Sequence, residues 1–292
     1  MIDWLLEPLS YPFMVRALGA TLVSAVACGL LSCWLVQIGW SLMGDAVSHS
    51  VLPGVALAYI VGIPFAVGAF VFGIGAVLLI GRVQSATKIK SDAAIGVVFT
   101  SLFALGIVLI SATPSQIDLT HILFGNVLGV SPVELITVAL IGTLTVILVF
   151  VKRRDLTLFA FDPGHANAIG ISVARLRWLL LTLLALTVVA TMQTVGIILV
   201  VAMLVIPGCT ARLLTRSMPG MLRVSVSVAV TASVAGVYAS YVADVSTGGA
   251  VVLVQSALFA LALTATGLRK LSAHRKSRVS LQHEHSHDAV TT

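Results

Sequence analysis

The chain has 292 residues, of which 59% are hydrophobic and only 10% are charged, and its mean hydropathy is +1.10. Soluble domains carry about 25% charged residues, so this composition excludes a water-soluble globular protein and predicts a polytopic membrane protein. The net charge is +6, and much of it lies in the segment LRKLSAHRKSRVS at 268–280, which lacks interleaved aromatic residues, so we expect no nucleic-acid partner.

The start of the chain does not predict a cleaved signal peptide. The first residues, MIDWLLEP, are acidic and lack the basic region and the small-residue cleavage site of such a signal. The apolar run at 17–38 is also long enough to cross a bilayer, which takes about 20 residues.

Nine apolar segments have the length and composition of membrane-spanning helices, and together they predict an all-α fold with eight or nine spans. Residues 178–193 and 195–211 are short, so we expect one of them to be broken or re-entrant. We expect residues 1–268 to form the transmembrane domain and 269–292 to be a disordered tail. The predicted spans are 17–38, 44–62, 64–81, 92–111, 132–151, 178–193, 195–211, 223–243 and 250–268.

The distribution of Lys and Arg predicts the orientation of these spans. Short loops rich in both residues remain in the cytoplasm. Such loops lie at 82–90, 152–177 and 212–223, whereas 112–131 and 242–249 contain neither residue. We therefore expect a cytoplasmic C-terminal tail.

Two helix starts carry recognisable capping residues. The motif SPVE at 131–134 offers Ser131 as N-cap and Glu134 at the capping-box position. The motif DPGH at 162–165 places Asp162 before a proline in the same way and opens a short amphipathic stretch. That stretch is either a docking surface on the cytoplasmic side or an ordinary connecting loop.

A weak internal repeat relates the two halves of the chain. SHSVLPGVALA (48–58) and AMLVIPGCTAR (202–212) both place Pro-Gly after an apolar pair. Repeated halves with Pro-Gly interruptions are typical of transporters.

The segment SLMGDAVSHSV contains a carboxylate and an imidazole in an otherwise apolar run. Asp45 and His49 are four residues apart, so a helix presents them on one face. An oxygen and an imidazole nitrogen make half of a site for manganese, iron or zinc, and two copies would supply four ligands. Ser48 and Ser50 could hold the second imidazole nitrogen or line a passage with Met43. The alternatives are a helix cap at Asp45 with one interhelical hydrogen bond from His49, or a proton relay.

Other polar and sulfur-containing residues carry weaker indications. Asp118 and His121 are expected at an outer interface, and alternating histidines at 283, 285 and 287 could bind a metal loosely as an accessory. The cysteines, Cys28, Cys33 and Cys209, lack zinc-site spacing, so we expect them to pack as small hydrophobes.

One motif is missing. No lysine follows a glycine anywhere in the chain, so the chain has no G-x-x-x-x-G-K-[ST] phosphate loop. We therefore expect any ATP hydrolysis to occur in another polypeptide and this chain to be no enzyme.

The segment GWSLMGDAVSHSVLPGVALAY resembles the signature of permease subunits of the manganese/zinc/iron-type bacterial ABC importers. The resemblance continues through IKSDAAIGVVFTSLFALGIVLIS, IDLTHILFGNVLGVS, FDPGHANAIGIS and GIILVVAMLVIPGCTARLLT, and spans about residues 19–267. It implies an importer permease in the bacterial plasma membrane. The implied partners are a second permease copy or a paralogue, two cytoplasmic ATPase subunits and an extracytoplasmic metal-binding protein.

The resemblance also implies roles for individual residues. Asp45 and His49 would contact the transported metal, which is the substrate and not a permanent cofactor. ATPase contacts are expected in the loop after the second Pro-Gly motif, beside the helix that Asp162 opens. The Pro in SHSVLPG and the run ILFGNVLGVS resemble the manganese/iron branch of the family more than the zinc branch. Asp and His without cysteine are compatible with manganese, so we expect manganese, with zinc or iron as alternatives. The expected coupling residues are Pro207, Gly208, Arg212, Arg216 and Asp162.

Two other classes of function compete with this interpretation. A proton-coupled secondary transporter would need no ATPase and would carry more buried carboxylates than this chain has. An intramembrane enzyme would need a catalytic constellation, and neither H-E-x-x-H nor G-x-S-x-G occurs.

Overall fold

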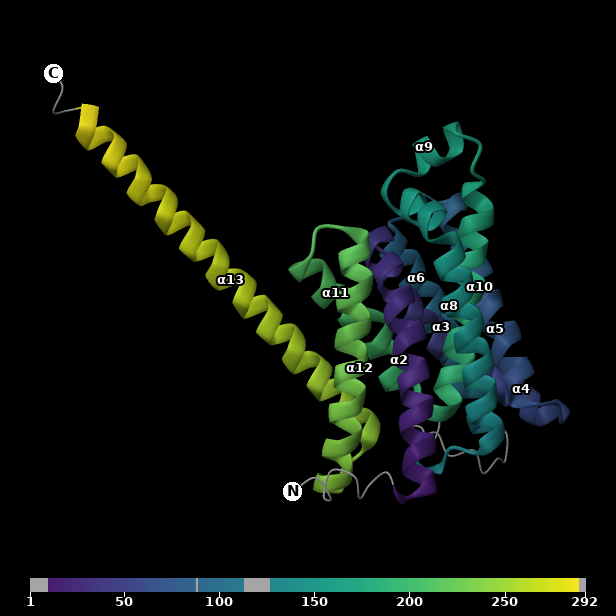
Figure 1. Ribbon diagram of the computed structural model, residues 1–292. Coiled ribbons are helices and arrows are strands. Elements are labelled where there is room, and N and C mark those ends of the chain that lie inside the picture. Colours follow the sequence, from purple (N-terminus) through teal and green to yellow (C-terminus); the bar gives the residue numbers. More distant parts are fainter. Residues whose placement is uncertain (1–9, 88, 113–126, 289–292) are drawn as a thin grey trace.

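The computed structural model describes residues 10–87, 89–112 and 127–288, with side chains as far as residue 268 apart from 85 and 128. Within these limits every regular element is a helix, and the helices pack as a bundle (Figure 1). They are α2 (Pro12–Ile38), α3 (Met43–Ser50), α4 (Leu52–Val61), α5 (Phe65–Ala86), α6 (Ser91–Ala112), the 3-10 turn η2 (Val127–Gly129), α8 (Pro132–Phe161), α9 (Pro163–Ala168), α10 (Val173–Val195), α11 (Ile197–Leu214), α12 (Met218–Ala243) and α13 (Thr247–Asp288).

Nine segments of the described chain are long and apolar enough to cross a membrane, which confirms the upper end of the predicted number. They are α2, α3 together with α4, α5, α6, α8, α10, α11, α12, and α13 as far as Leu268. Several helices extend beyond the apolar runs. The helix α8, for example, continues through the KRRD segment to Phe161, because Lys, Arg and Leu are good helix formers.

The interrupted span is not the one that the sequence predicted. Residues 173–195 and 197–214 form the continuous helices α10 and α11, joined at Gly196 with a φ of 83°. The interruption lies instead at Val51, between α3 and α4. Pro53 has no N–H to donate to the carbonyl of His49 four residues earlier. The apolar segment 178–193 is short because polar residues flank it within α10, and not because the helix is broken.

The helix α2 lies at the centre of the bundle and packs against α8, α10, α11 and α12. Small side chains on several of its faces allow neighbouring backbones to approach closely, which is the main source of helix packing in lipid. Cys28 and Cys33 are buried among them, as expected, and Cys209 of α11 is half-buried. The small buried residues of α2 are Ala17, Ala20, Ser24, Ala25, Ala27, Cys28, Gly29, Ser32 and Cys33.

Both Pro-Gly pairs mark places where two helix backbones touch. A Cβ atom on Gly54 of α4 would lie 2.2 Å from the carbonyl oxygen of Gly68 in α5. A Cβ atom on Gly208 of α11 would lie 2.7 Å from the carbonyl oxygen of Ser32 in α2. The two halves thus use Pro-Gly for the same purpose, while their origin as an internal repeat stays a prediction.

The predicted capping residues are confirmed. The Ser131 hydroxyl accepts a hydrogen bond from the Glu134 N–H, and the Glu134 carboxylate accepts one from the Ser131 N–H at 2.8 Å. Asp162 accepts a hydrogen bond from the His165 N–H at 2.9 Å and begins α9.

The last part of α13 extends away from the bundle (Figure 1). Its backbone is helical to Asp288. The side chains after residue 268, including His283, His285 and His287, lie outside the described residues. The disorder of 269–292 and the accessory metal site therefore stay predictions.

The Gly54 contact leads to a stability prediction. Gly54→Ala should lower the thermal stability of the detergent-purified protein, because the new methyl group overlaps the Gly68 backbone and overpacking costs about 1–3 kcal/mol. The matched control is Gly75→Ala in α5, where a Cβ atom meets nothing within 4 Å. This control should be neutral or slightly stabilising, because Ala favours helix by about 1 kcal/mol over Gly. Equal melting temperatures for the two variants would contradict the packing argument.

Candidate functional site

Asp45 and His49 occupy the open face of α3. They are the two residues of this helix that are not buried, and their side chains are 34% and 21% exposed. The His49 Nε2 lies 3.3 Å from the Asp45 Oδ1, one helical turn away. The i, i+4 spacing therefore brings the carboxylate and the imidazole together, as the sequence predicted.

The structure does not support the simple capping interpretation of this pair. The N-cap of α3 is Leu42, which makes no side-chain capping bond. Asp45 lies inside the first turn, where a carboxylate interacts favourably with the helix dipole. The His49 ring contacts Asp45 of its own helix, and its Nδ1 is buried without a hydrogen-bond partner among the described residues. The expected interhelical hydrogen bond is therefore absent from this part of the chain.

Two phenylalanines of α6 hold the His49 ring. The ring centroids lie 5.3 Å from Phe99 and 5.1 Å from Phe103, the second in a T-shaped arrangement. The phenylalanines stack on each other at 6.1 Å. They were not among the residues predicted from the sequence, although their i, i+4 spacing in VFTSLF is the signal that places both on one face of α6.

The neighbouring serines and Met43 point into the bundle. Ser48 is fully buried and donates a hydrogen bond to the Gly44 carbonyl at 2.8 Å. Ser50 is also fully buried, and its hydroxyl has no partner within the described residues. Met43 is 2% exposed. Neither serine holds the His49 Nδ1, so that expectation is wrong, and none of the three shares the open face in this conformation.

The pair can supply two adjacent ligands to a divalent ion. Ligands at about 2.1 Å from a metal lie about 3.0 Å apart in octahedral geometry and about 3.4 Å apart in tetrahedral geometry. The observed 3.3 Å between Oδ1 and Nε2 falls in this range. The described residues contain no group of three or more His, Cys, Asp or Glu side chains that could hold a metal ion, and Asp118 and His121 lie outside them. Within the described part of the chain, the pair therefore offers two of the ligands that a divalent ion would need.

The second Pro-Gly pair lies inside a helix and not in a loop. Pro207 and Gly208 are buried in α11, and the connection to α12 is only 215–217. The Gly208 N–H donates to the Ser32 hydroxyl of α2 at 3.0 Å. Gly208 fixes α11 against the central helix and Pro207 is buried beside it, so the prediction that both residues lie in an exposed coupling loop is wrong.

The remaining coupling candidates lie at the end of the bundle that carries α9. Arg212 is exposed at the last turn of α11, and its guanidinium donates to the Gln37 side chain of α2. Arg216 is exposed in the short turn that follows. Asp162 is exposed at the start of α9, and Ile169, which ends that helix, is 55% exposed. In Figure 1, α9 lies beyond the end of the long helices.

Comparison with known proteins identifies the family of this chain. Residues 10–266 match the ABC 3 transport family. The chain is 51% identical over 260 residues to the manganese transport system membrane protein MntB of Synechocystis, which covers 89% of this chain and 85% of that protein. It is 48% identical over 257 residues to the chelated iron transport system membrane protein YfeD of Yersinia pestis, covering 88% and 86% of the two chains.

A solved structure shows the same fold. The structure of PsaBC from Streptococcus pneumoniae in complex with Fab matches with a TM-score of 0.80 and 39% identity, over 90% of this chain and 95% of that chain. The family match alone covers far more than half of the sequence. This chain therefore belongs to the ABC 3 transport family.

Proposed function

We propose that this chain is the permease subunit of an ATP-driven importer for divalent transition metal ions, with manganese as the main substrate. The observation that carries the proposal is the Asp45–His49 pair on the open face of α3. Relatives named for manganese and for chelated iron support this substrate class. The hard carboxylate and the borderline imidazole, without a thiolate, suit manganese and also accept iron or zinc.

A second permease copy or a paralogue completes the site in this proposal. One chain offers an oxygen and a nitrogen on a face that is open in the single chain. A two-fold contact repeats each patch on both subunits, so two such chains would present four ligands. An ion in a low-dielectric layer needs replacement ligands for its hydration shell, which explains why the membrane span tolerates Asp45.

The distribution of the other carboxylates argues against a proton relay. In the described part of the chain they lie at or near helix ends, where water reaches them. Asp45 also lies in the first turn of its helix, but it is the described carboxylate that pairs with an imidazole. One Asp–His pair is too few groups for a chain of proton carriers. The others are Asp92, Glu134, Asp155, Asp162 and Asp244.

The energy would come from two ATPase subunits docked at the α9 end. This end carries Arg216 in the turn after α11, Arg212 in the last turn of α11 and Arg175 in the first turn of α10, so the positive-inside rule supports a position on the cytoplasmic side of a bacterial plasma membrane. The helix α9 exposes the cap residue Asp162 and the apolar Ile169. Closure of the ATPases would move α9 and the 215–217 turn, while a metal-binding protein delivers the ion at the opposite end.

The metal-pathway role predicts a loss of uptake. Asp45→Asn keeps the shape of the side chain, and His49→Gln replaces the imidazole by a neutral amide of similar reach; both weaken the metal-ligand character. Each should lower labelled-manganese uptake by the reconstituted complex by at least about tenfold, since even an outer-shell partner is worth 10–100-fold. Competition with iron and zinc in the wild-type complex would rank the substrates.

The matched control is Asp244→Asn. Asp244 ends α12 at a φ of 50°, a conformation that Asn tolerates well, so uptake should be unchanged. Normal uptake by both site variants in a correctly assembled complex would remove the pair from the pathway. Uptake that continues without any ATPase would instead support the secondary transporter.

The docking role predicts a loss of ATPase association. Ile169→Asp places a charge on the exposed apolar end of α9, so it should reduce the amount of ATPase that co-purifies with the permease. Ile63→Asp is the matched control, because Ile63 is 42% exposed in the turn between α4 and α5 at the other end of the bundle. If Ile169→Asp retains as much ATPase as Ile63→Asp, α9 is not the docking surface.

A further inference from the structure

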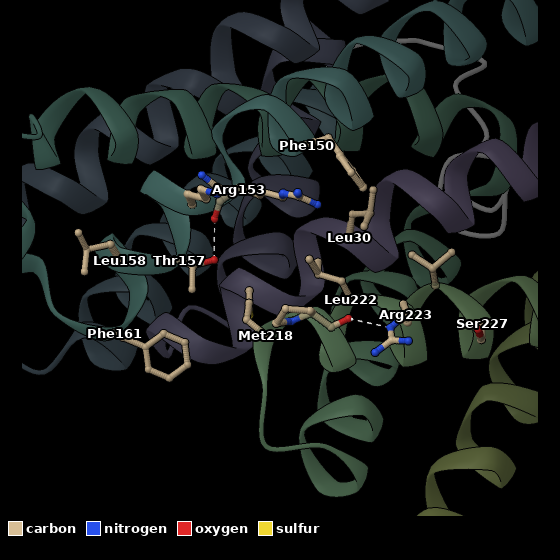
Figure 2. A pocket seen from close by; sticks show the side chains of 13 residues that line it. Leu30, Phe150, Arg153, Thr157, Leu158, Phe161, Met218, Leu222, Arg223 and Ser227 are labelled. Carbon is tan, nitrogen blue, oxygen red and sulfur yellow. Dashed lines mark hydrogen bonds between the residues drawn. The ribbon is translucent and has the colours of Figure 1, made fainter.

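A groove with a cavity volume of about 1090 Å³ lies between α8 and α12, with α2 at its floor. Figure 2 shows Arg153 of α8 and Arg223 of α12 reaching it from its two walls, with Leu30 of α2 between them. Most of the lining is apolar, and it includes Phe150 and Leu222. These side chains come from other helices than the metal pair, which lies on α3.

Three arginines line this groove, and the described residues that line it include no acidic side chain. Arg153, Arg154 and Arg223 are exposed. The nearby acidic residue, Asp155, pairs with Lys152 at 3.1 Å. The groove therefore combines a wholly positive charge with a large apolar surface.

The three arginines lie at one depth. About 20 helical residues cross the hydrocarbon core of a bilayer. Counted from the first residue of α8, that length ends at Val151, shortly before Arg153 and Arg154. Counted back from the last residue of α12, it ends at residue 224, directly after Arg223. All three guanidinium groups therefore lie where the hydrocarbon core meets the phosphate layer.

Local contacts orient two of the arginines. The Arg153 guanidinium carbon lies 4.9 Å from the centre of the Phe150 ring, which is cation–π geometry. The Arg223 Nε donates to the Pro219 carbonyl at 3.4 Å. Each guanidinium keeps N–H donors beyond these contacts, and such donors bind phosphate oxygens well.

We propose that this groove binds an anionic phospholipid, with its phosphate between the arginines and an acyl chain along Leu30, Phe150 and Val226. Basic pockets between membrane helices on the cytoplasmic side have the chemistry for anionic lipid headgroups. The cavity is large enough, since pockets for drug-sized ligands measure about 300–1,000 Å³. A second copy docked here about a two-fold axis would bring six arginines together, so like charges disfavour it.

Native mass spectrometry of the purified full-length chain tests this site. The probes are phosphatidylglycerol and phosphatidylethanolamine with identical acyl chains. The wild type should retain more phosphatidylglycerol than phosphatidylethanolamine. In the double variant Arg153→Gln, Arg223→Gln, phosphatidylglycerol retention should fall about fivefold for each arginine removed. Phosphatidylethanolamine retention should not change. The matched control Arg175→Gln removes an exposed arginine outside the groove and should retain the anionic lipid.

A second variant tests the apolar part of the groove without changing its charge. Ser227 lines the groove and is exposed, so Ser227→Trp should fill it and lower phosphatidylglycerol retention several-fold. Ser256→Trp is the control, because Ser256 is exposed on α13. Equal retention of both lipids by the wild type, or no loss in either groove variant relative to its control, would overturn the proposal. The readout involves no metal, so it is independent of the proposed transport function.

Discussion

Direct backbone contact between helices is the constraint on which this structure depends. The hydrophobic effect that brings helices together in water is absent in lipid. Close packing and interhelical hydrogen bonds must therefore stabilise helix association there. Gly54 lies against Gly68, and Gly208 lies against Ser32 with an N–H···O bond. Each contact occurs next to a proline that has already removed a backbone donor. The chain thus places the same residue pair at a close backbone contact in both helices.

The position of Asp45 and His49 follows from this packing. Gly44 of α3 lies so close to α11 that a Cβ atom would be 2.7 Å from a Leu204 methyl group. Ser48 and Ser50 are buried on the packed side, which leaves Asp45 and His49 on the open side. Phe99 and Phe103 then restrict the imidazole to one orientation. Packing of this kind matters for a polar pair in a membrane, because a mobile pair would lose its ligand geometry.

The two sides of the bundle carry different chemistry. The side formed by α3 and α6 presents a carboxylate and an imidazole with aromatic support. The groove between α8 and α12 presents arginines and apolar side chains at the membrane boundary. The first suits a divalent cation and the second suits an anionic amphiphile. The two proposed sites, one for the transported ion and one for a lipid, therefore lie at separate places on the chain.

The sequence by itself determined the all-helical fold, the helix caps and the spacing of Asp45 and His49, and it limited the spans to eight or nine, because hydropathy and i, i+4 geometry are local properties. The residues of Pro207–Gly208 look like those of an exposed coupling loop in the sequence, yet they are buried in α11. Only the tertiary structure decided the burial of this pair, the break at Val51, the inward-facing serines and the arginine groove. Each of these depends on which helix lies opposite, and residues as distant in sequence as Ser32 and Gly208 meet only after packing.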